Sequence, residues 1–276
     1  MHHLRCPLCA GQLQQVATTL RCHYGHAFDL SRQGYVNLLT GRAPANADTP
    51  QMVTARTELL AAGHFDFLTR AIADTAAESV PDNGHGLVVD VGAGTGHYLA
   101  AVLDRLPSHH GLALDIAKAA VRRAARAHSR ADAAVCDAWR GLPLGDECAD
   151  LVLDVFAPRN GAEFHRVLRR GGALLVVTPR PHHLAELVGA LGLIGVDPDK
   201  DRRVEAALGR WFQLEQETEY GHQLELGRED AARLVAMGPS AWHTEPARLA
   251  ADLAALPTPL KISASVSLRR FLPRRS

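Results

Sequence analysis

The stretch Leu87-Val88-Val89-Asp90-Val91-Gly92-Ala93-Gly94-Thr95-Gly96 joins a continuous apolar run to three closely spaced glycines. Such a run is typical of a strand that is buried on both faces of a parallel sheet. The glycines allow a sharp turn and let a ligand lie against the main chain, beside the N–H groups that begin the next helix. The spacing is G-x-G-x-G, whereas a dinucleotide fingerprint is G-x-G-x-x-G. The stretch therefore predicts a ligand-binding loop after the first strand of an α/β sheet.

Strand-like and helix-like segments alternate on the C-terminal side of this loop. Four strands are expected there, over 111–115, 133–137, 149–156 and 173–178. Four helices are expected before, between and after them, over 97–106, 117–128, 162–169 and 182–193. This alternation indicates βαβ units and a mostly parallel sheet. A helical lead-in is expected over 51–80 and a substrate-side insert over 200–260.

Aspartates end the second and third of the expected strands. In a doubly wound sheet the ligand lies outside the carboxyl ends of the strands, so Asp115 and Asp137 should flank one crevice. A carboxylate after the second strand can accept hydrogen bonds from two ribose hydroxyls, and one after the third can accept from an adenine amine. Together with the glycine loop, these residues predict a site for a nucleoside-type cofactor.

Three of the five cysteines lie within the first 22 residues. Cys6, Cys9, Cys22 and His26 form the pattern C-x2-C-x12-C-x3-H, whose two halves can each offer two ligands to one tetrahedral Zn²⁺ ion. Four protein ligands would fill the coordination shell, so the metal should be structural. His23 is the alternative fourth ligand. We expect a zinc ribbon over 1–38, a linker rich in Pro and small residues over 39–50, and the main domain over 51–276.

The composition, 47% apolar and 22% charged in 276 residues, is that of an ordinary globular protein. No apolar run is long enough to span a membrane and the N-terminus lacks a signal-peptide pattern, so we expect a cytoplasmic protein. The formal net charge of zero argues against a nucleic-acid partner. Local basic patches argue for a nucleic-acid partner. Arginine, which binds phosphates and stacks on bases, also outnumbers lysine 27 to 3. The candidate RNA-binding residues are Arg32, Tyr35, Arg122, Arg123 and Arg126.

Residues 87–180 resemble the class I S-adenosylmethionine-dependent methyltransferases. The quoted glycine stretch resembles their first motif, and Cys136-Asp137-Ala138, Asp150–Asn160 and Leu168–Gly172 resemble later ones. The resemblance implies a Rossmann-like doubly wound sheet, mostly parallel, and S-adenosylmethionine as the methyl donor. The cofactor-binding residues would be Asp90, Gly92, Gly94, Thr95, Gly96, His97, Asp115, Asp137 and Ala138.

The parts outside this core resemble the 23S rRNA guanine-N1 methyltransferases that carry an N-terminal zinc ribbon (RlmA type). The resemblance covers nearly the whole chain and rests on 22–29, 32–38 and Met237-Gly238-Pro239-Ser240-Ala241-Trp242. It implies methyl transfer to N1 of a guanine in a hairpin loop of the large-subunit RNA, and it is compatible with a homodimer. The segment 238–243 and the Arg-rich composition favour the macrolide-resistance branch of this family (TlrB-like). The target would then be guanine 748 rather than guanine 745.

Three residues are candidates for the transfer step. Asp154 would accept the N1 proton, although it could instead point away or cap a loop. Backbone groups near Pro158 would orient the guanine, and Trp242 would stack on the base unless it belongs to the core. The alternative function is a small-molecule methyltransferase, acting on a quinone or an antibiotic, with the ribbon as a protein-docking module. It predicts an apolar, nearly closed pocket between 51–72 and 202–237.

Overall fold

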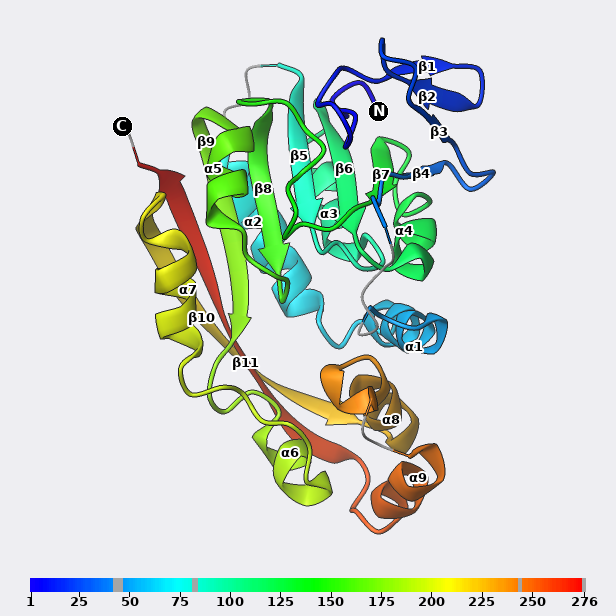
Figure 1. Ribbon diagram of the computed structural model, residues 1–276. Helices are drawn as coiled ribbons and strands as arrows, with labels where there is room; N and C mark the ends of the chain where they lie inside the picture. Colours follow the sequence, from blue (N-terminus) through cyan, green and yellow to red (C-terminus); the bar gives the residue numbers. More distant parts are fainter. Residues whose placement is uncertain (42–46, 81–83, 243–244, 275–276) are drawn as a thin grey trace.

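The computed structural model describes residues 1–41, 47–80, 84–242 and 245–274, and its centre is an eight-stranded sheet. The strand order is β10-β11-β9-β8-β5-β6-β7-β4 (Figure 1). The strands are β4 (Tyr35–Asn37), β5 (Gly86–Val91), β6 (His109–Asp115), β7 (Ala131–Val135), β8 (Ala149–Val155), β9 (Leu168–Pro179), β10 (Phe212–Leu226) and β11 (Leu260–Pro273). Strands β4 to β9 pair in parallel, whereas β11 pairs antiparallel with both β9 and β10. The predicted doubly wound, mostly parallel sheet is confirmed.

Strands β5 and β8 are apolar because both of their faces are covered. All seven residues of β8 are buried, as are the last five of β5. Val88 points into one hydrophobic core, and Val89 and Val91 point into the other. Because successive side chains of a strand alternate between the faces, each residue of such a strand contributes to one of two cores. The glycine loop therefore follows directly from a strand that is buried on both faces.

Helices cover both faces of the sheet. Helices α2 (Asp66–Ser79) and α3 (His97–Arg105) cover one face, while α5 (Gly161–Val167) and α7 (Lys200–Leu208) cover the other. The remaining helical elements are α1 (Pro50–Ala61), α4 (Lys118–Ala124), α6 (Ala185–Leu191), α8 (Arg228–Ala236), the 3₁₀ turn η1 (Pro239–Trp242) and α9 (Pro246–Ala254). The expected helical lead-in is thus two helices, α1 and α2. Thr49 begins α1, because its hydroxyl accepts the Met52 N–H at 3.2 Å and a proline follows it.

The N-terminal module is a three-stranded antiparallel sheet that packs on the main domain. It contains β1 (Gln14–Val16), β2 (Thr19–Arg21) and β3 (Ala27–Asp29). Leu4, Leu13 and Leu20 belong to the same hydrophobic core as Val89 of β5. Strand β4 lies within the predicted ribbon range 1–38 but pairs with β7 at the edge of the large sheet. Residues 42–46 of the expected linker lie outside the described residues.

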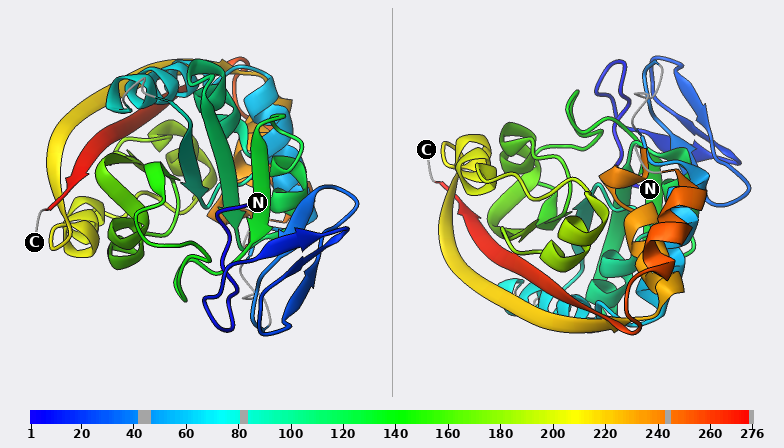
Figure 2. Two further views of the ribbon diagram at one scale, coloured as in Figure 1. Left: turned by 90° about the horizontal axis from the view of Figure 1, so that it is seen from above. Right: turned by 90° about the horizontal axis from the view of Figure 1, so that it is seen from below.

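The C-terminal side of the sheet differs in detail from the sequence prediction. Strand β9 begins at Leu168 and continues through Gly171-Gly172, where a helix followed by a turn was expected. Leu168 pairs with Ala149 across a register irregularity, and Gly171 has φ +80°, so the pair of glycines bends the strand without ending it. The long strands β10 and β11 form the outer edge of the molecule, far from the N-terminal module (Figure 2). Within the described part of the chain, no helix has the length and apolar character needed to cross a membrane.

Candidate functional site

A cavity of about 760 Å³ opens where the central parallel strands end. Its lining combines the glycine loop after β5, the segment after β8, the start of α6 and the region from α8 to η1. This volume lies within the usual range for small-molecule sites, about 300–1,000 Å³. Its walls therefore come from the loops at the carboxyl ends of the strands and from the helical elements α1, α6, α8 and η1.

The glycines of the loop have separate tasks. Gly92 has φ +72°, and a Cβ at this position would lie 2.5 Å from the Cβ of Ala157. Gly94 has φ +54°, and its N–H donates to Oδ2 of Asp115 at 2.8 Å. Gly96 begins α3 and faces α4, where an added Cβ would lie 3.0 Å from the Cα of Ala124. Gly92 and Gly94 line the cavity together with Thr95, whereas the predicted cofactor residue Gly96 serves close packing of α3 on α4.

The predicted acidic residues lie around the same end of the cavity. Both carboxylate oxygens of Asp115 already accept a backbone N–H, from Gly94 and from Ala117, each at 2.8 Å. These bonds fix the orientation of the carboxylate and leave further lone pairs for ribose hydroxyls. Asp137 lies two residues beyond β7, and its Oδ1 accepts the Trp139 N–H at 3.0 Å. Ala138 completes this wall of the cavity.

Asp90 is the most buried acid of the cavity lining. Burial raises the pKa of its carboxyl to about 8, and the nearby charges of Asp115 and Asp154 act in the same direction. The predicted cofactor residue His97 also lines the cavity, and its Nε2 lies 2.9 Å from the Thr69 hydroxyl. Burial lowers the pKa of His97, so the ring is uncharged near neutral pH. The arrangement therefore holds an uncharged acid and a half-buried neutral imidazole beside the glycine loop.

Asp154 is not brought to the cavity. Its carboxylate is completely buried and forms an ion pair with Arg159, with 3.2 Å between Oδ1 and Nε. Burial raises its pKa to about 8, against the opposing effect of Arg159 and Lys200. Asp154 lies two residues after Val152 in β8, and side chains two apart on a strand point to the same face. Its side chain therefore points, like that of Val152, to the face covered by α5 and α7. In this structure the carboxylate faces the interior and does not line the transfer site.

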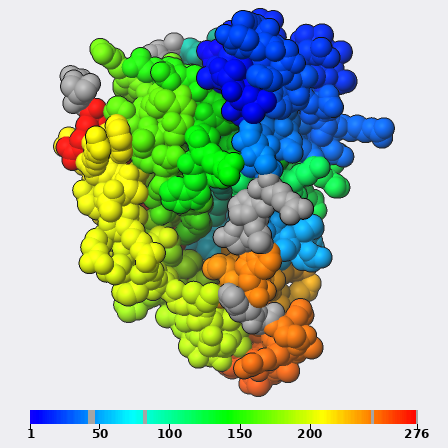
Figure 3. Space-filling model, in the orientation of Figure 1, coloured from blue at the N-terminus to red at the C-terminus, as the bar shows by residue number. Residues whose placement is uncertain are grey.

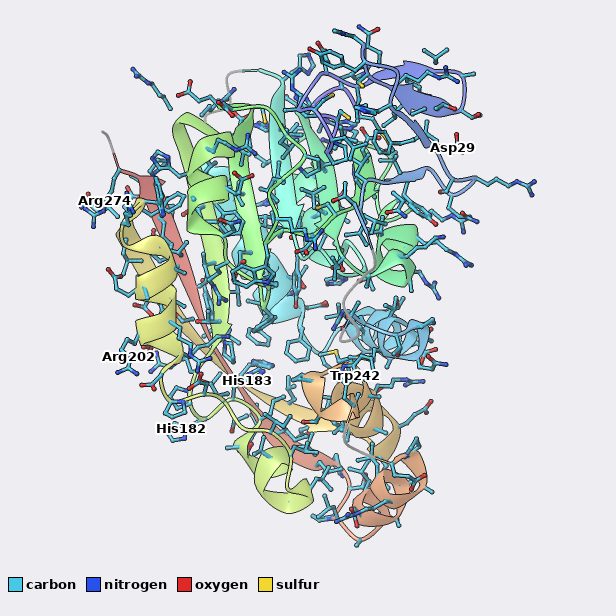
Figure 4. The ribbon with its side chains drawn as sticks, in the orientation of Figure 1. Asp29, His182, His183, Arg202, Trp242 and Arg274 are labelled. Carbon is cyan, nitrogen blue, oxygen red and sulfur yellow. The ribbon has the colours of Figure 1, made fainter. Side chains whose placement is uncertain are left out.

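Phe156, His183 and Trp242 also line the cavity, and we call this part of the lining the aromatic end. Phe156 follows β8 with φ +56° and remains 43% exposed, and its ring lies 6.1 Å from that of His183 at an interplanar angle of 27°. Trp242 in η1 also lines the cavity and is 43% exposed, so it is not a core residue (Figure 4). Pro158 lies in the same wall as Phe156. A non-glycine residue with positive φ that stays exposed at a cavity is a feature of functional sites.

His183 was missed by the sequence analysis, which placed it without a role inside an expected helix. The Ser265 N–H donates to its Nδ1 at 3.1 Å, and burial lowers the pKa of the imidazole to about 4. Phe156 lay within the quoted motif segment, but nothing in that segment indicated its exposure. No local pattern could have found His183, because its partner comes from β11, more than 80 residues later.

The four predicted zinc ligands converge in the N-terminal module. Their ligand atoms lie within 4.8 Å of one another, and Nδ1 of His26 is 3.4 Å from the sulfurs of both Cys6 and Cys22. The sulfurs of Cys9 and Cys22 are 3.7 Å apart. These separations fit a tetrahedral Zn²⁺ with bonds of about 2.0–2.3 Å. The alternative ligand His23 is exposed and lies against Tyr24, so His26 completes the set.

Four of the five candidate RNA-binding residues are on the surface. Arg32, Arg122, Arg123 and Arg126 are exposed, and none of them forms an ion pair with another described residue. The N-terminal module and α4 lie on the same side of the molecule (Figure 3). Tyr35 is only 5% exposed and packs in the core beneath β4 and β7, which contradicts its expected role as a stacking platform. Tyr24 and Trp139 are well exposed aromatic side chains, and Trp139 also lines the cavity.

Comparisons with known proteins agree with this architecture. The profile of the RlmA N-terminal zinc ribbon matches residues 4–43, and that of a methyltransferase domain matches residues 88–172. The 23S rRNA (guanine(748)-N(1))-methyltransferase of Streptomyces fradiae is 48% identical over 97% of this chain and 95% of its own length. A Micromonospora griseorubida protein, named as a candidate 23S rRNA (guanine-N(1)-)-methyltransferase, is 55% identical over 98% of this chain and 97% of its own length.

The chain belongs to the 23S rRNA guanine-N1 methyltransferase family.

The fold alone is shared more widely than this family. The YcgJ protein of Bacillus subtilis superposes with a TM-score of 0.51 at 15% identity, covering 75% of this chain and all of its own. The class I methyltransferase fold and S-adenosylmethionine as methyl donor are therefore confirmed, as is the zinc ribbon. His243, part of the segment that favoured the guanine 748 type, lies outside the described residues.

Proposed function

We propose that this enzyme transfers a methyl group from S-adenosylmethionine to N1 of guanine 748 in a hairpin loop of 23S rRNA. The observation that carries the proposal is one cavity that joins the glycine loop and Asp115 to the aromatic set Phe156, His183 and Trp242. Such a cavity can hold an adenosine at one end and a planar base at the other. The 48% identity to the Streptomyces fradiae enzyme, over nearly the full length of both chains, supports the choice of guanine. We also propose that methylation at this position confers macrolide resistance.

The residues of the cofactor end suit S-adenosylmethionine. Asp115 would bind the ribose hydroxyls, Asp137 with Ala138 would bind the adenine, and Gly92 and Gly94 would admit the donor close to the main chain. When bound, the cofactor supplies an electrophilic methyl group beside the segment after β8. The ionised form of Asp90 would face a cation there, so its proton would leave when the cofactor binds.

The target guanine would leave its loop and enter the aromatic end of the cavity. Extrusion is least costly for a base that is already unpaired, and an aromatic platform replaces the stacking it loses. Phe156 and Trp242 are exposed rings of the lining that could serve this purpose, and Trp139 is a third. Main-chain groups around Pro158 would orient the Watson–Crick edge. Since Asp154 is buried away from the cavity, water rather than this carboxylate would take the N1 proton.

The RNA would approach along the side that carries the exposed arginines. Arg122, Arg123 and Arg126 on α4 and Arg32 beside β4 would neutralise phosphates of the hairpin. We propose that residues 1–38 act as a docking module, joined through 39–50 to the domain over 51–276, and that two copies hold one hairpin. Sedimentation of the protein with and without the hairpin tests the dimer, and a single copy per hairpin would refute it.

The decisive experiment uses 23S rRNA from a strain that lacks the modification. Incubation with tritiated S-adenosylmethionine should label one guanine, and reverse transcriptase should stop there because an N1 methyl group blocks base pairing. The Asp115→Ala variant is the control, and it should give no label. Label on another guanine would overturn the assignment to guanine 748. Label on a small molecule and none on RNA would instead support the alternative function.

A further inference from the structure

His183 lies at the aromatic end of the cavity, just before α6. Figure 4 shows His182 at the outer edge of the molecule and His183 nearer the centre. His183 lines the cavity and is half-buried, whereas His182 is exposed. The two adjacent imidazoles therefore offer a matched pair in which one ring faces the proposed substrate and the other faces solvent.

A single hydrogen bond defines the protonation state of His183. The main-chain N–H of Ser265, in β11, donates to Nδ1, so Nδ1 must carry a lone pair. The proton of the neutral ring then resides on Nε2. Burial lowers the pKa of this imidazole to about 4, so the ring is neutral at physiological pH. His183 is consequently a hydrogen-bond donor through Nε2, and it has no basic nitrogen free to act as a proton acceptor.

The donor edge of His183 is available to a ligand. Because Nδ1 is directed to the main chain of β11, Nε2 lies on the side of the ring away from that bond. Among the described residues, none accepts a hydrogen bond from Nε2. The neighbouring Phe156 ring is nearly parallel to the imidazole, at 27°. A planar base that stacks on Phe156 would therefore lie nearly parallel to the imidazole.

We propose that the Nε2–H of His183 donates a hydrogen bond to O6 of the target guanine and stabilises the negative charge that reaches O6 during methyl transfer. This inference rests on the proposed function. Guanine N1 forms a bond to the methyl carbon while the sulfur–carbon bond breaks, sulfur keeps that electron pair, and the N1 proton passes to water. As the proton leaves, the electron pair of N1 is shared with O6 through C6. A fixed neutral donor at O6 therefore binds the transition state more strongly than the ground state.

The same hydrogen bond would also select the base. Adenine carries an amino group at the position of O6, and two donors would then face each other in a partly dehydrated site. A buried polar group left without a partner is costly, so such a site rejects the wrong base. His183 is thus proposed to act both as a catalytic residue and as a specificity determinant.

Three substitutions at one position separate this role from a structural one. His183→Ala should lower kcat about 100-fold, the usual effect of losing one such donor, with a change in KM below about 10-fold. His183→Gln places an N–H near the site of Nε2 and should recover part of kcat. His183→Asn places an oxygen near the site of Nδ1, where it can still accept the Ser265 N–H, and should not recover kcat. Rescue by Asn but not by Gln would show a structural role and overturn the proposal. His182→Ala is the control and should retain wild-type kcat.

Binding to hairpin RNA provides a readout that does not depend on turnover. Hairpins carry guanine, inosine or 2-aminopurine at the target position, and of these only 2-aminopurine lacks O6. The wild-type protein with S-adenosylhomocysteine should bind the guanine and inosine hairpins about 3- to 10-fold more tightly than the 2-aminopurine hairpin. Because 2-aminopurine also lacks the N1–H, the test is the change in this preference: His183→Ala should lose most of it. Equal binding of the three hairpins by the wild-type protein would refute the contact, even if a variant failed to fold.

The outcomes also distinguish this inference from the proposed function. If wild-type enzyme labels no guanine in 23S rRNA, the proposed function fails, and the inference fails with it. If wild-type enzyme labels the guanine and His183→Ala has normal kcat and normal discrimination, only the inference fails.

Discussion

Replacing Gly92 by alanine should destabilise the protein through two separable effects. The first is backbone strain, because φ is +72° and an L side chain in this region costs about 1–2 kcal/mol. The second is a collision, because the new Cβ would lie 2.5 Å from the Cβ of Ala157 and its neighbours would have to shift. Overpacking of this kind costs about 1–3 kcal/mol. We therefore expect Gly92→Ala to lower the free energy of unfolding by about 2–5 kcal/mol.

Two further variants separate these effects in urea unfolding experiments. Gly171 has a similar φ of +80° and no atom within 4 Å of an added Cβ, so Gly171→Ala should cost only the backbone strain. Combining Gly92→Ala with Ala157→Gly should remove the collision and recover about 1–3 kcal/mol, measured as the coupling energy of a double-mutant cycle. If Gly92→Ala and Gly171→Ala cost the same, or if Ala157→Gly gives no recovery, the close approach of the loop to the segment after β8 is refuted.

Three other outcomes test the metal, the cofactor end and the RNA face. Cys22→Ser should lose about one equivalent of zinc per chain in metal analysis. Cys148→Ser, outside the ligand set, should keep the metal. Equal metal content in the two variants would refute the proposed zinc site. Because the raised pKa of Asp90, about 8, keeps it protonated below that pH, affinity for cationic S-adenosylmethionine should rise as pH increases from 6 to 8 and then level off. Calorimetry in buffers of different ionisation enthalpy should show proton release at pH 7, and a pH-independent affinity would contradict the assignment. Arg123→Ala should weaken hairpin binding and reduce the salt slope by about 1, whereas Arg202→Ala on the opposite side should leave both unchanged.

The architecture was largely predictable because it depends on local patterns. The apolar run of β5, the alternation of strands with helices and the spacing of the zinc ligands each reflect a physical requirement that acts over a few residues. Boundaries were less predictable, as β9 shows, because its pairing with β8 overrides the break suggested by two glycines. Registers and boundaries depend on partners that the local sequence does not display.

The orientations of the side chains in the candidate site were harder to predict from the sequence than the fold. Asp154 was predicted at the transfer site from its motif, but alternation along a strand that is buried on both faces decides which way it points. Tyr35 belongs to a basic segment, yet its strand completes the large sheet and its ring enters the core. His183 gains its tautomer from a main-chain group of β11. These roles arise from tertiary contacts, so only the structure could assign them.

Strand β4 has a consequence for a cell that is short of zinc. It covers Ala133–Val135 at the edge of β7, and the module that holds β4 in place is organised around the four metal ligands. An uncovered strand edge is a template for pairing with another chain. Metal starvation should therefore produce a methyltransferase that self-associates through the uncovered edge of β7, in addition to any loss of RNA binding.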